Sequence, residues 1–513
     1  MKLSASDLPR VALESFLPHW LPSRRWFGGK ARTIAGAGVL DRFPLSPEPG
    51  QPAIFIIEVR YNRGPPEIYL LPAAGNAATP EARIGESGWC ECLNHGSLWR
   101  TLLGIIVRGE SLRGERGGAL VGNPGQLPPR RSLRRLLSIS WRLGGAEQSN
   151  SSATFGDTFF LKLYRRMEEG INPEVEMLKA LTDQGVFTHI PPFRGAIEYC
   201  PPAGPPASAA VLIQCIPRAL DAWTWAGTAV DVLSRRVIHT VNPPELPAEA
   251  LRPIPDALRP ALEEIVSKSV CKRLILLGER TAEMHLALAK LSDDPAFAPD
   301  PLLLSDLQIP RRTGRARGGI SHAGDRSGEV VADSARLAEK ARNAIQAVLH
   351  SLSNSPALGE KIRIHGDYHL GQVLIASKDL VVIDFEGEPA RSITERRAKQ
   401  SPLKDVAGMI RSFHYASRAG LMLENNARPG KPPPDQEAWA DFWYRAASRL
   451  FLGSYLERLG DKSPLLPADR RARDGLLKLF LLEKALYELA YELNHRPAWA
   501  GIPLRGIASL LAE

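Results

Sequence analysis

Hydrophobic positions follow two different periods along the chain, and the change between them separates two kinds of structure. Residues 53–59 (AIFIIEV) and 67–71 (EIYLL) are short apolar runs closed by polar, Gly or Pro residues, so each predicts a strand. From residue 218 onward, apolar residues recur at helical spacing, as in 274–288 and 333–352, which predicts helices. The pattern therefore predicts an α+β protein with a mainly helical second half.

Chain length and turn-forming residues predict the domain boundaries. A chain of 513 residues is too long for one ordinary hydrophobic core, so two or three domains are expected. The stretch 122–131 (GNPGQLPPRR) is rich in Gly and Pro and predicts a linker. We expect an N-terminal α/β cap module over 1–130, a small lobe over 131–217 and a mainly helical lobe over 218–513.

Residues 362–389 carry the clearest chemical signal. One apolar run ends at His365 and a second ends at Asp384, so Asp367 and Asp384 should both lie just past the ends of short strands. Phosphoryl transfer needs one carboxylate to orient or deprotonate a hydroxyl, and oxygen ligands to hold Mg²⁺. We therefore expect Asp367 to be the base, and Gln372 and Asp384 to hold Mg²⁺. The alternative for a lone Gly-Asp pair is a simple turn.

Longer motifs resemble a known family. H-G-D-x-H at 365–369, followed by D-F-E at 384–386, resembles the aminoglycoside-phosphotransferase-like branch of the protein-kinase fold. Within that branch the sequence is similar to bacterial maltokinases, which phosphorylate maltose from ATP to give maltose 1-phosphate. The similar segments run from near the start to near the end of the chain: 25–30 (RWFGGK), 145–166, 384–416 and 483–504.

The resemblance implies a fold, cofactors and a substrate. We expect a bilobal protein-kinase-like fold with the cap on the amino-terminal lobe. ATP and Mg²⁺ are the implied cofactors and maltose the implied acceptor. In maltokinase relatives the product feeds α-glucan synthesis, so a trehalose synthase is a possible functional partner.

Residues between 131 and 217 receive nucleotide-binding roles from the resemblance. Lys162 lies inside an alternating strand and is expected to hold the α- and β-phosphates of ATP. Its ionic partner should come from the helix after Asn172, and we expect Glu176, because Glu174 in the first turn could simply complement the helix dipole. The other expected contacts are in the phosphate loop and the hinge: Ser149, Asn150, Ser151, Gln214 and Ile216.

The acceptor sugar is expected on a helix near the C-terminus. Five residues recur there on one helix face: Lys484, Tyr487, Glu488, Tyr491 and Glu492. This face is either a salt-bridged surface or a sugar platform, because Tyr rings stack on pyranose faces while Lys and Glu bond hydroxyls. The resemblance favours the platform. We add His365 and Glu386 as sugar contacts, although Glu386 could instead aid the metal and His365 could bond backbone beside Asp384.

Three other features have simpler explanations. Cys90 and Cys92 with His95 lack the spacing of a zinc site, so we expect ordinary thiols. His285 lies in an apolar helix and is predicted to be a packed core residue. Asp405 opens a helix and is predicted to cap it, although kinase relatives often tie such a helix back to the catalytic loop.

Composition narrows the remaining classes. The chain has 44% hydrophobic and 24% charged residues, no apolar run of membrane-spanning length, no apolar leader and five scattered cysteines, so we expect a cytoplasmic protein without membrane contact. The net charge of +9 has local sources, including an Arg/Gly-rich insertion at 311–328 that we expect to be a solvated, partly disordered loop. Because no aromatic residues interleave with these arginines, no nucleic-acid binding is expected.

Other functions stay open on the sequence alone. Within enzymes, the alternative is a related kinase for glucosamine, another hexose or an aminoglycoside. A pseudokinase that binds nucleotide without turnover is a second alternative, although every acid that the chemistry needs is present. A nucleic-acid binder would instead show steeply salt-dependent binding. Gln372 stands where many kinases carry Asn, but the longer amide still supplies an oxygen.

Overall fold

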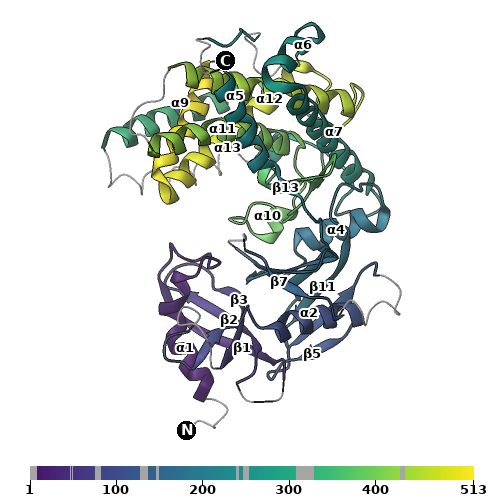
Figure 1. Cartoon of the computed structure of the whole chain (residues 1–513), viewed down its shortest axis with the longest axis vertical. Coiled ribbons are helices and arrows are strands. Elements are labelled where there is room, and N and C mark those ends of the chain that lie inside the picture. Colours follow the sequence, from purple (N-terminus) through teal and green to yellow (C-terminus); the bar gives the residue numbers. More distant parts are fainter. Residues whose placement is uncertain are drawn as a thin grey trace. The chain divides into compact units, whose positions relative to one another are not determined.

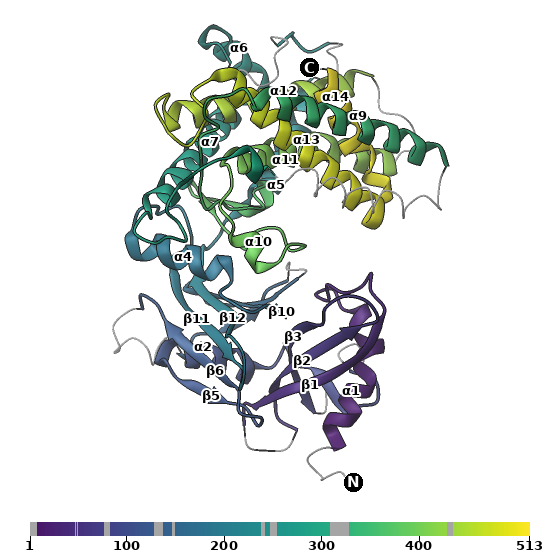
Figure 2. The same ribbon diagram turned by 180° about the vertical axis from the view of Figure 1, so that it is seen from behind.

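Two compact units make up the chain. The computed structural model describes residues 8–46, 48, 50–75, 83–127, 137–145, 149–237, 242–246, 254–307, 328–427 and 434–512. Unit 1 contains residues 1–217 and a short return segment, 389–395, and unit 2 contains 218–388 and 396–513 (Figures 1 and 2). The division after residue 217 coincides with the predicted start of the helical lobe. Both arginine-rich stretches, 130–135 and 311–327, lie outside the described residues.

The cap of unit 1 is an antiparallel sheet covered by one helix. Its elements are α1 (Leu8–Trp20), η1 (Leu21–Ser23), β1 (Ile34–Pro44), β2 (Ala53–Tyr61), β3 (Glu67–Gly75), β4 (Trp89–Glu91) and β10 (Arg166–Met167). The strands pair in the order β1-β2-β3-β10, and β4 pairs with β3. The two predicted strands are thus confirmed as parts of β2 and β3.

Both faces of this sheet are buried, which explains why β2 is apolar at nearly every position. Phe55 and Ile57 share a core cluster with Leu13 of α1. Ile54 and Ile56 point the other way and pack in a second cluster with residues of α2 (Gly96–Arg108) and of the neighbouring sheet. The cap and the small lobe therefore share one hydrophobic core.

The small lobe is a second antiparallel sheet. Its strands are β5 (Ser111–Arg113), β6 (Ala119–Pro124), β7 (Trp141–Leu143), β8 (Ser151–Phe155), β9 (Phe159–Leu163), β11 (Phe193–Cys200) and β12 (Ala207–Gln214), in the order β5-β6-β11-β12-β9-β8-β7. Helix α4 (Pro173–Gln184) packs against β11 and β12. Because β5 and β6 already belong to this sheet, the lobe begins before the boundary predicted at 122–131, and 128–131 of that stretch lie outside the described residues.

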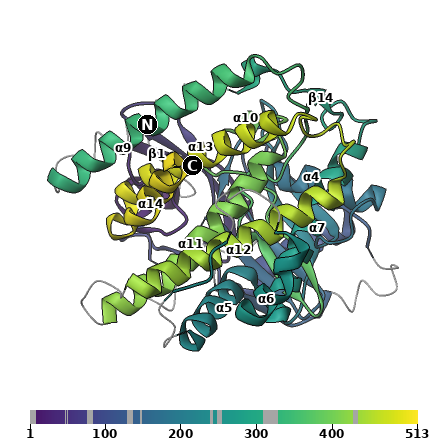
Figure 3. The same ribbon diagram turned by 90° about the horizontal axis from the view of Figure 1, so that it is seen from above.

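Unit 2 is mainly helical (Figure 3). Its α-helices are α5 (Ala222–Arg236), α6 (Arg259–Leu262), α7 (Lys268–Lys290), α9 (Gly328–Leu352), α11 (Leu403–Ala427), α12 (Pro434–Leu459), α13 (Arg470–His495) and α14 (Gly501–Ala512), and α10 (Ile393–Arg397) spans the junction with unit 1. Its strands and short helical turns are β13 (Leu220–Asp221), β14 (Asp300–Pro301), β15 (Glu360–Lys361), β16 (Val373–Ala376), β17 (Asp379–Val382), η3 (Asp256–Leu258), η4 (Glu263–Ser267), η5 (Leu304–Asp306), η7 (Leu370–Gln372) and η8 (Pro497–Trp499). The predicted α+β class is confirmed.

The helices and the cysteines bear on two predictions, the absence of a membrane span and of a disulfide framework. Among the described helices, none combines the length and the apolar character needed to cross a bilayer. All five cysteines are free thiols. Cys90 and Cys92 are buried, and burial raises the pKa of Cys92 to about 12, which suits an inert thiol.

Candidate active site

A buried carboxylate holds the start of the predicted catalytic loop. Asp405, in the first turn of α11, accepts from the backbone N–H groups of His365 (2.8 Å) and Gly366 (2.9 Å) and from His285 Nε2 (3.2 Å). Burial alone would raise the pKa of Asp405, but the hydrogen bond and charge of His285 hold that pKa below its usual value. The predicted helix cap is therefore wrong, and Asp405 ties α11 to the loop. His285 is fully buried, which confirms a packed core histidine.

His365 is an internal brace of the same loop. It is 1% exposed, its Nε2–H donates to the Ile383 carbonyl oxygen at 2.9 Å, and its Nδ1 accepts from the Asp367 N–H at 3.4 Å. Its ring packs against Phe385 with the centroids 4.8 Å apart. The predicted sugar contact is wrong because the ring is enclosed, whereas the predicted bond to the backbone beside Asp384 is confirmed.

The two predicted metal ligands lie side by side in unit 2. Gln372 Nε2 is 2.9 Å from Asp384 Oδ2, and the Ile383 N–H donates to the Gln372 carbonyl oxygen at 3.0 Å. Asp384 follows β17, as predicted, and has a φ of 65°, a left-handed conformation that is unfavourable for a residue with a Cβ. The turn is therefore held by its surroundings, which include the His365–Ile383 bond.

Lys484 of α13 contacts Asp367, the predicted catalytic base. Its Nζ lies 3.1 Å from Asp367 Oδ1 and 3.3 Å from Glu388 Oε1, and it stands over the Tyr487 ring at 5.1 Å. Burial alone would lower the pKa of Lys484, but the charges of Asp367 and Glu388 raise it above its usual value, so the ammonium stays charged. Burial raises the pKa of Tyr487 to about 12. Lys484 therefore lies between Asp367 and the Tyr487 ring, and the sugar contacts predicted for Lys484 and Tyr487 stay predictions.

The remaining residues of the predicted sugar platform differ in burial and in their contacts. Glu492 is 1% exposed and binds Arg496 at 2.7 Å and the Tyr415 hydroxyl at 3.2 Å, so a direct sugar contact from Glu492 is wrong. Glu488 Oε2 accepts two hydrogen bonds from the buried Arg411, at 2.7 and 2.9 Å. Tyr491 is 43% exposed and stacks on His495. The roles of Glu488 and Tyr491 stay predictions.

A buried ion pair occupies the small lobe of unit 1. Lys162 Nζ lies 3.1 Å from Glu174 Oε2, which also accepts from the Tyr164 hydroxyl at 2.8 Å. Asn172 caps α4 as predicted, because its side-chain oxygen accepts from the Glu174 N–H at 2.9 Å. The choice of Glu176 is wrong: residues two apart lie about 200° apart around a helix, and it is Glu174 that points to the sheet.

The predicted phosphate loop and hinge occupy the edges of the same lobe. Asn150 and Ser151 line a pocket of about 290 Å³, together with Gly144 and with Arg24 and Arg25 of the cap. Ser149 precedes them, and 146–148 lie outside the described residues. Gln214 ends β12 and accepts from Arg194 at 2.6 Å, and Ile216 follows it. The nucleotide contacts assigned to these residues stay predictions.

Two residues that the sequence analysis did not select contact the predicted lysines or their partners. Glu388 pairs with Lys484, and Tyr164 shares Glu174 with Lys162. Both had a signal. Acids stand at every second position in Asp384, Glu386 and Glu388, and Tyr164 lies two residues after Lys162, on the same strand face.

A sheet lobe with a buried Lys–Glu pair and a helical unit with a paired acid and amide define a kinase-like phosphotransferase. The sequence model of the phosphotransferase enzyme family matches residues 140–413, more than half of the chain, and the chain belongs to this family. The model of the maltokinase N-terminal cap domain matches residues 20–98. The protein is thus a kinase that transfers phosphate to a hydroxyl acceptor, and the two models together support a sugar phosphotransferase.

Similar proteins are glucosamine kinases. That of Streptacidiphilus jiangxiensis is 28% identical over 370 residues, which cover 72% of each chain. That of Mycolicibacterium smegmatis (strain ATCC 700084 / mc(2)155) is 28% identical over 372 residues, covering 72% of this chain and 78% of the other. A solved glucosamine kinase in complex with glucosamine, ADP and inorganic phosphate has a TM-score of 0.60 at 22% identity, covering 99% of this chain and 100% of the other. The last likeness concerns the fold, and the predicted kinase-like fold is confirmed.

Proposed function

We propose that this protein is an ATP- and Mg²⁺-dependent maltokinase, which transfers the γ-phosphate of ATP to the anomeric hydroxyl of maltose and releases maltose 1-phosphate and ADP. The observation that carries the proposal is the 3.1 Å contact between Lys484 and Asp367. It sets the C-terminal helix, whose sequence resembles that of maltokinases, directly against the predicted base. The match of the maltokinase cap model to residues 20–98 supports the same substrate.

Asp367 is the proposed base. Its carboxylate would accept a hydrogen bond from the sugar hydroxyl and orient it toward the phosphate, or take its proton. Lys484 lies between Asp367 and Glu388, so one positive charge faces two negative ones. Tyr487 beside Lys484 would pack against the sugar ring.

Gln372 and Asp384 are the proposed magnesium ligands. Their side chains already lie 2.9 Å apart, and an amide oxygen and a carboxylate are donors that suit Mg²⁺. Bound Mg²⁺ would neutralise charge on the phosphates. Glu386, two residues after Asp384, would aid the metal or the sugar.

Lys162 is the proposed phosphate ligand of the small lobe. Glu174 and Tyr164 fix the direction of its ammonium group, so its orientation is set before the nucleotide binds. Ser149, Asn150 and Ser151 would offer backbone N–H groups to the phosphates, and the backbone at Gln214 and Ile216 would meet adenine. We place the reaction in the cytoplasm because the five cysteines are scattered and free, and the resemblance implies a trehalose synthase as a functional partner.

Glucosamine kinase is the second candidate, because two 28% identical relatives carry that name. A coupled assay of ADP release with maltose, glucosamine, glucose and an aminoglycoside separates the candidates. We expect the highest kcat/KM with maltose and a product that carries phosphate at C1. A higher kcat/KM with glucosamine would show that glucosamine, not maltose, is the acceptor. Failure to transfer phosphate to any sugar would overturn the proposal.

A further inference from the structure

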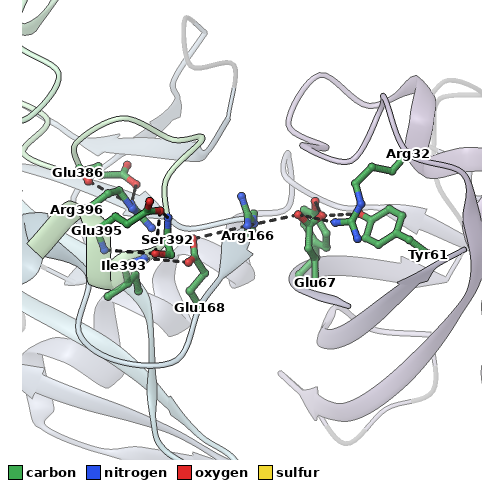
Figure 4. Close-up of polar contacts among 11 residues, drawn as sticks. Arg32, Tyr61, Glu67, Arg166, Glu168, Glu386, Ser392, Ile393, Glu395 and Arg396 are labelled. Atoms are coloured by element: carbon green, nitrogen blue, oxygen red, sulfur yellow. Dashed lines mark hydrogen bonds and ion pairs between the residues drawn. The ribbon is translucent and has the colours of Figure 1, made fainter. Parts of the chain in front are cut away.

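The chain leaves the small lobe between Lys162 and Glu174 and joins the cap. Strand β10 pairs with β3, with Arg166 opposite Tyr69, and thereby extends the cap sheet. The Arg166 guanidinium lies 3.4 Å from Glu67, whose carboxylate also accepts from the hydroxyls of Tyr61 and Tyr69 and lies 3.3 Å from Arg32 (Figure 4). Arg166 is thus attached to the cap through both its backbone and its side chain.

Glu168 continues this chain of contacts to the return segment. One carboxylate oxygen lies 3.9 Å from Arg166, and the other accepts from the backbone N–H of Ile393 at 3.1 Å (Figure 4). Ile393 begins α10, where the first N–H groups have no partner within the helix. Ser392 and Glu395 bond each other at the same end, at 3.1 and 3.3 Å.

The return segment follows closely on the proposed metal ligands. Residues 389–395 belong to unit 1, although the residues on both sides belong to unit 2. Just beyond it, Arg396 donates to the Glu386 carbonyl oxygen at 3.2 Å, and a Cβ on Gly387 would lie 3.4 Å from the Arg396 side chain. The stretch after Asp384 is therefore held at Glu386 by Arg396 and at Ile393 by Glu168.

We propose that Glu168 is a positioning residue, which fixes the return segment and through it the conformation of the Asp384 turn. Asp384 and Gly387 both have left-handed φ values, 65° and 74°, and such a turn keeps its shape only while its surroundings hold it. The inference rests on the proposed role of Asp384 as a magnesium ligand. It gives the cap a catalytic consequence, because Arg166 links Glu168 to the cap carboxylate Glu67.

The contacts of Glu168 with Ile393 and with Arg166 differ in strength, so their removal should have effects of different size. A carboxylate that accepts from a backbone N–H makes a charge-assisted hydrogen bond, among the stronger kinds. The Arg166 side chain is 35% exposed, and ion pairs of that exposure contribute little. Removing the Glu168 carboxylate should therefore matter more than removing the Arg166 guanidinium.

The test compares Glu168→Ala with Glu168→Gln, which keeps an acceptor oxygen, and with Asp183→Ala, which removes an exposed ion pair in α4. Hydrogen–deuterium exchange of the Ile393 amide should become roughly tenfold faster in Glu168→Ala and change less in Glu168→Gln and Asp183→Ala. Affinity for Mg·ADP should fall severalfold in Glu168→Ala, with metal-free ADP binding unchanged. With the best acceptor, kcat should fall while KM for the sugar stays constant.

Each outcome decides the proposal. Unchanged exchange at Ile393 in Glu168→Ala would show that Glu168 does not anchor the segment. Faster exchange with unchanged Mg·ADP affinity would show that the anchor does not position Asp384. Since neither measurement needs a sugar, failure to phosphorylate maltose would count against the proposed substrate alone.

Discussion

Two lysines, one in each unit, face carboxylates in different charge balances. In unit 1, Lys162 contacts the carboxylate of Glu174, and both side chains are at most 6% exposed. In unit 2, Lys484 meets Asp367 and Glu388, and all three keep between 5% and 23% of their side-chain surface exposed. The first is a closed pair, in which a buried carboxylate sets one direction for an ammonium group. The second is an open cluster, in which one ammonium group contacts two carboxylates and Asp367 stays partly exposed.

The largest expected effect comes from the open cluster. Asp367→Asn keeps the size of the side chain but removes the proposed base, so kcat should fall by about 10²–10⁴-fold. Binding of Mg·ADP, measured by calorimetry, should stay within error of the wild type. A fall in kcat of only a few-fold would remove Asp367 from the role of base.

Lys162→Met breaks the closed pair and leaves Glu174 buried without its cation. Loss of one partner of a buried ion pair costs about 3–5 kcal/mol, so the free energy of unfolding in urea should fall by that order. The double variant Lys162→Met with Glu174→Gln should regain most of this stability, because the buried charge is gone, but no activity. Equal stability of the single and double variants would contradict a coupled pair.

Lys484→Met tests the open cluster from its positive side. Because Asp367 and Lys484 are partly exposed, we expect a smaller loss of stability than in Lys162→Met, a fall in kcat of roughly 10-fold or more, and a higher KM for the sugar. Lys478→Met, on the same helix, is the matched control and should behave as the wild type. An unchanged KM for the sugar would argue that α13 does not contribute to the acceptor site.

Of these variants, Asp405→Asn should have the smallest effect at neutral pH. Its main consequence should be a change in how the free energy of unfolding depends on pH. The pKa of Asp405 is lower in the folded protein than in the unfolded chain, so its stabilisation is present above about pH 4 and is lost as the pH falls further through the folded pKa. The difference in unfolding free energy between wild type and Asp405→Asn should therefore shrink on acidification. A constant difference from about pH 6 to pH 3 would contradict this assignment.

The sequence predicted the positions of several polar residues better than the contacts that support them. Asp384, the amide of Gln372 and the cap at Asn172 are local features, because a strand end or a helix start positions them within a few residues. Two buried strands of the cap were equally predictable from their apolar runs. The first run of the catalytic stretch, by contrast, forms no strand up to His365, since β15 ends at Lys361.

The errors share a physical cause. Glu176, His365 and Glu492 are polar residues whose type suits a site, yet the direction in which each side chain points depends on packing from distant segments. His365 is enclosed by Phe385, and Glu492 by Tyr415 of another helix. Asp405 was predicted to cap its own helix, but its carboxylate accepts from the backbone N–H of His365, 40 residues earlier in the chain. Periodicity places residues on faces and does not say what covers each face.

The central claim is that Asp367, before β16, acts on the proton of the sugar hydroxyl, whereas Asp384, after β17, binds the metal. Calorimetric titration of ADP with and without Mg²⁺ into wild type, Asp367→Asn and Asp384→Ala tests it most directly. We predict that Asp384→Ala loses the Mg²⁺-dependent part of ADP affinity, whereas Asp367→Asn binds Mg·ADP as the wild type does and fails only in turnover. Equal Mg·ADP affinity in all three proteins would contradict the account.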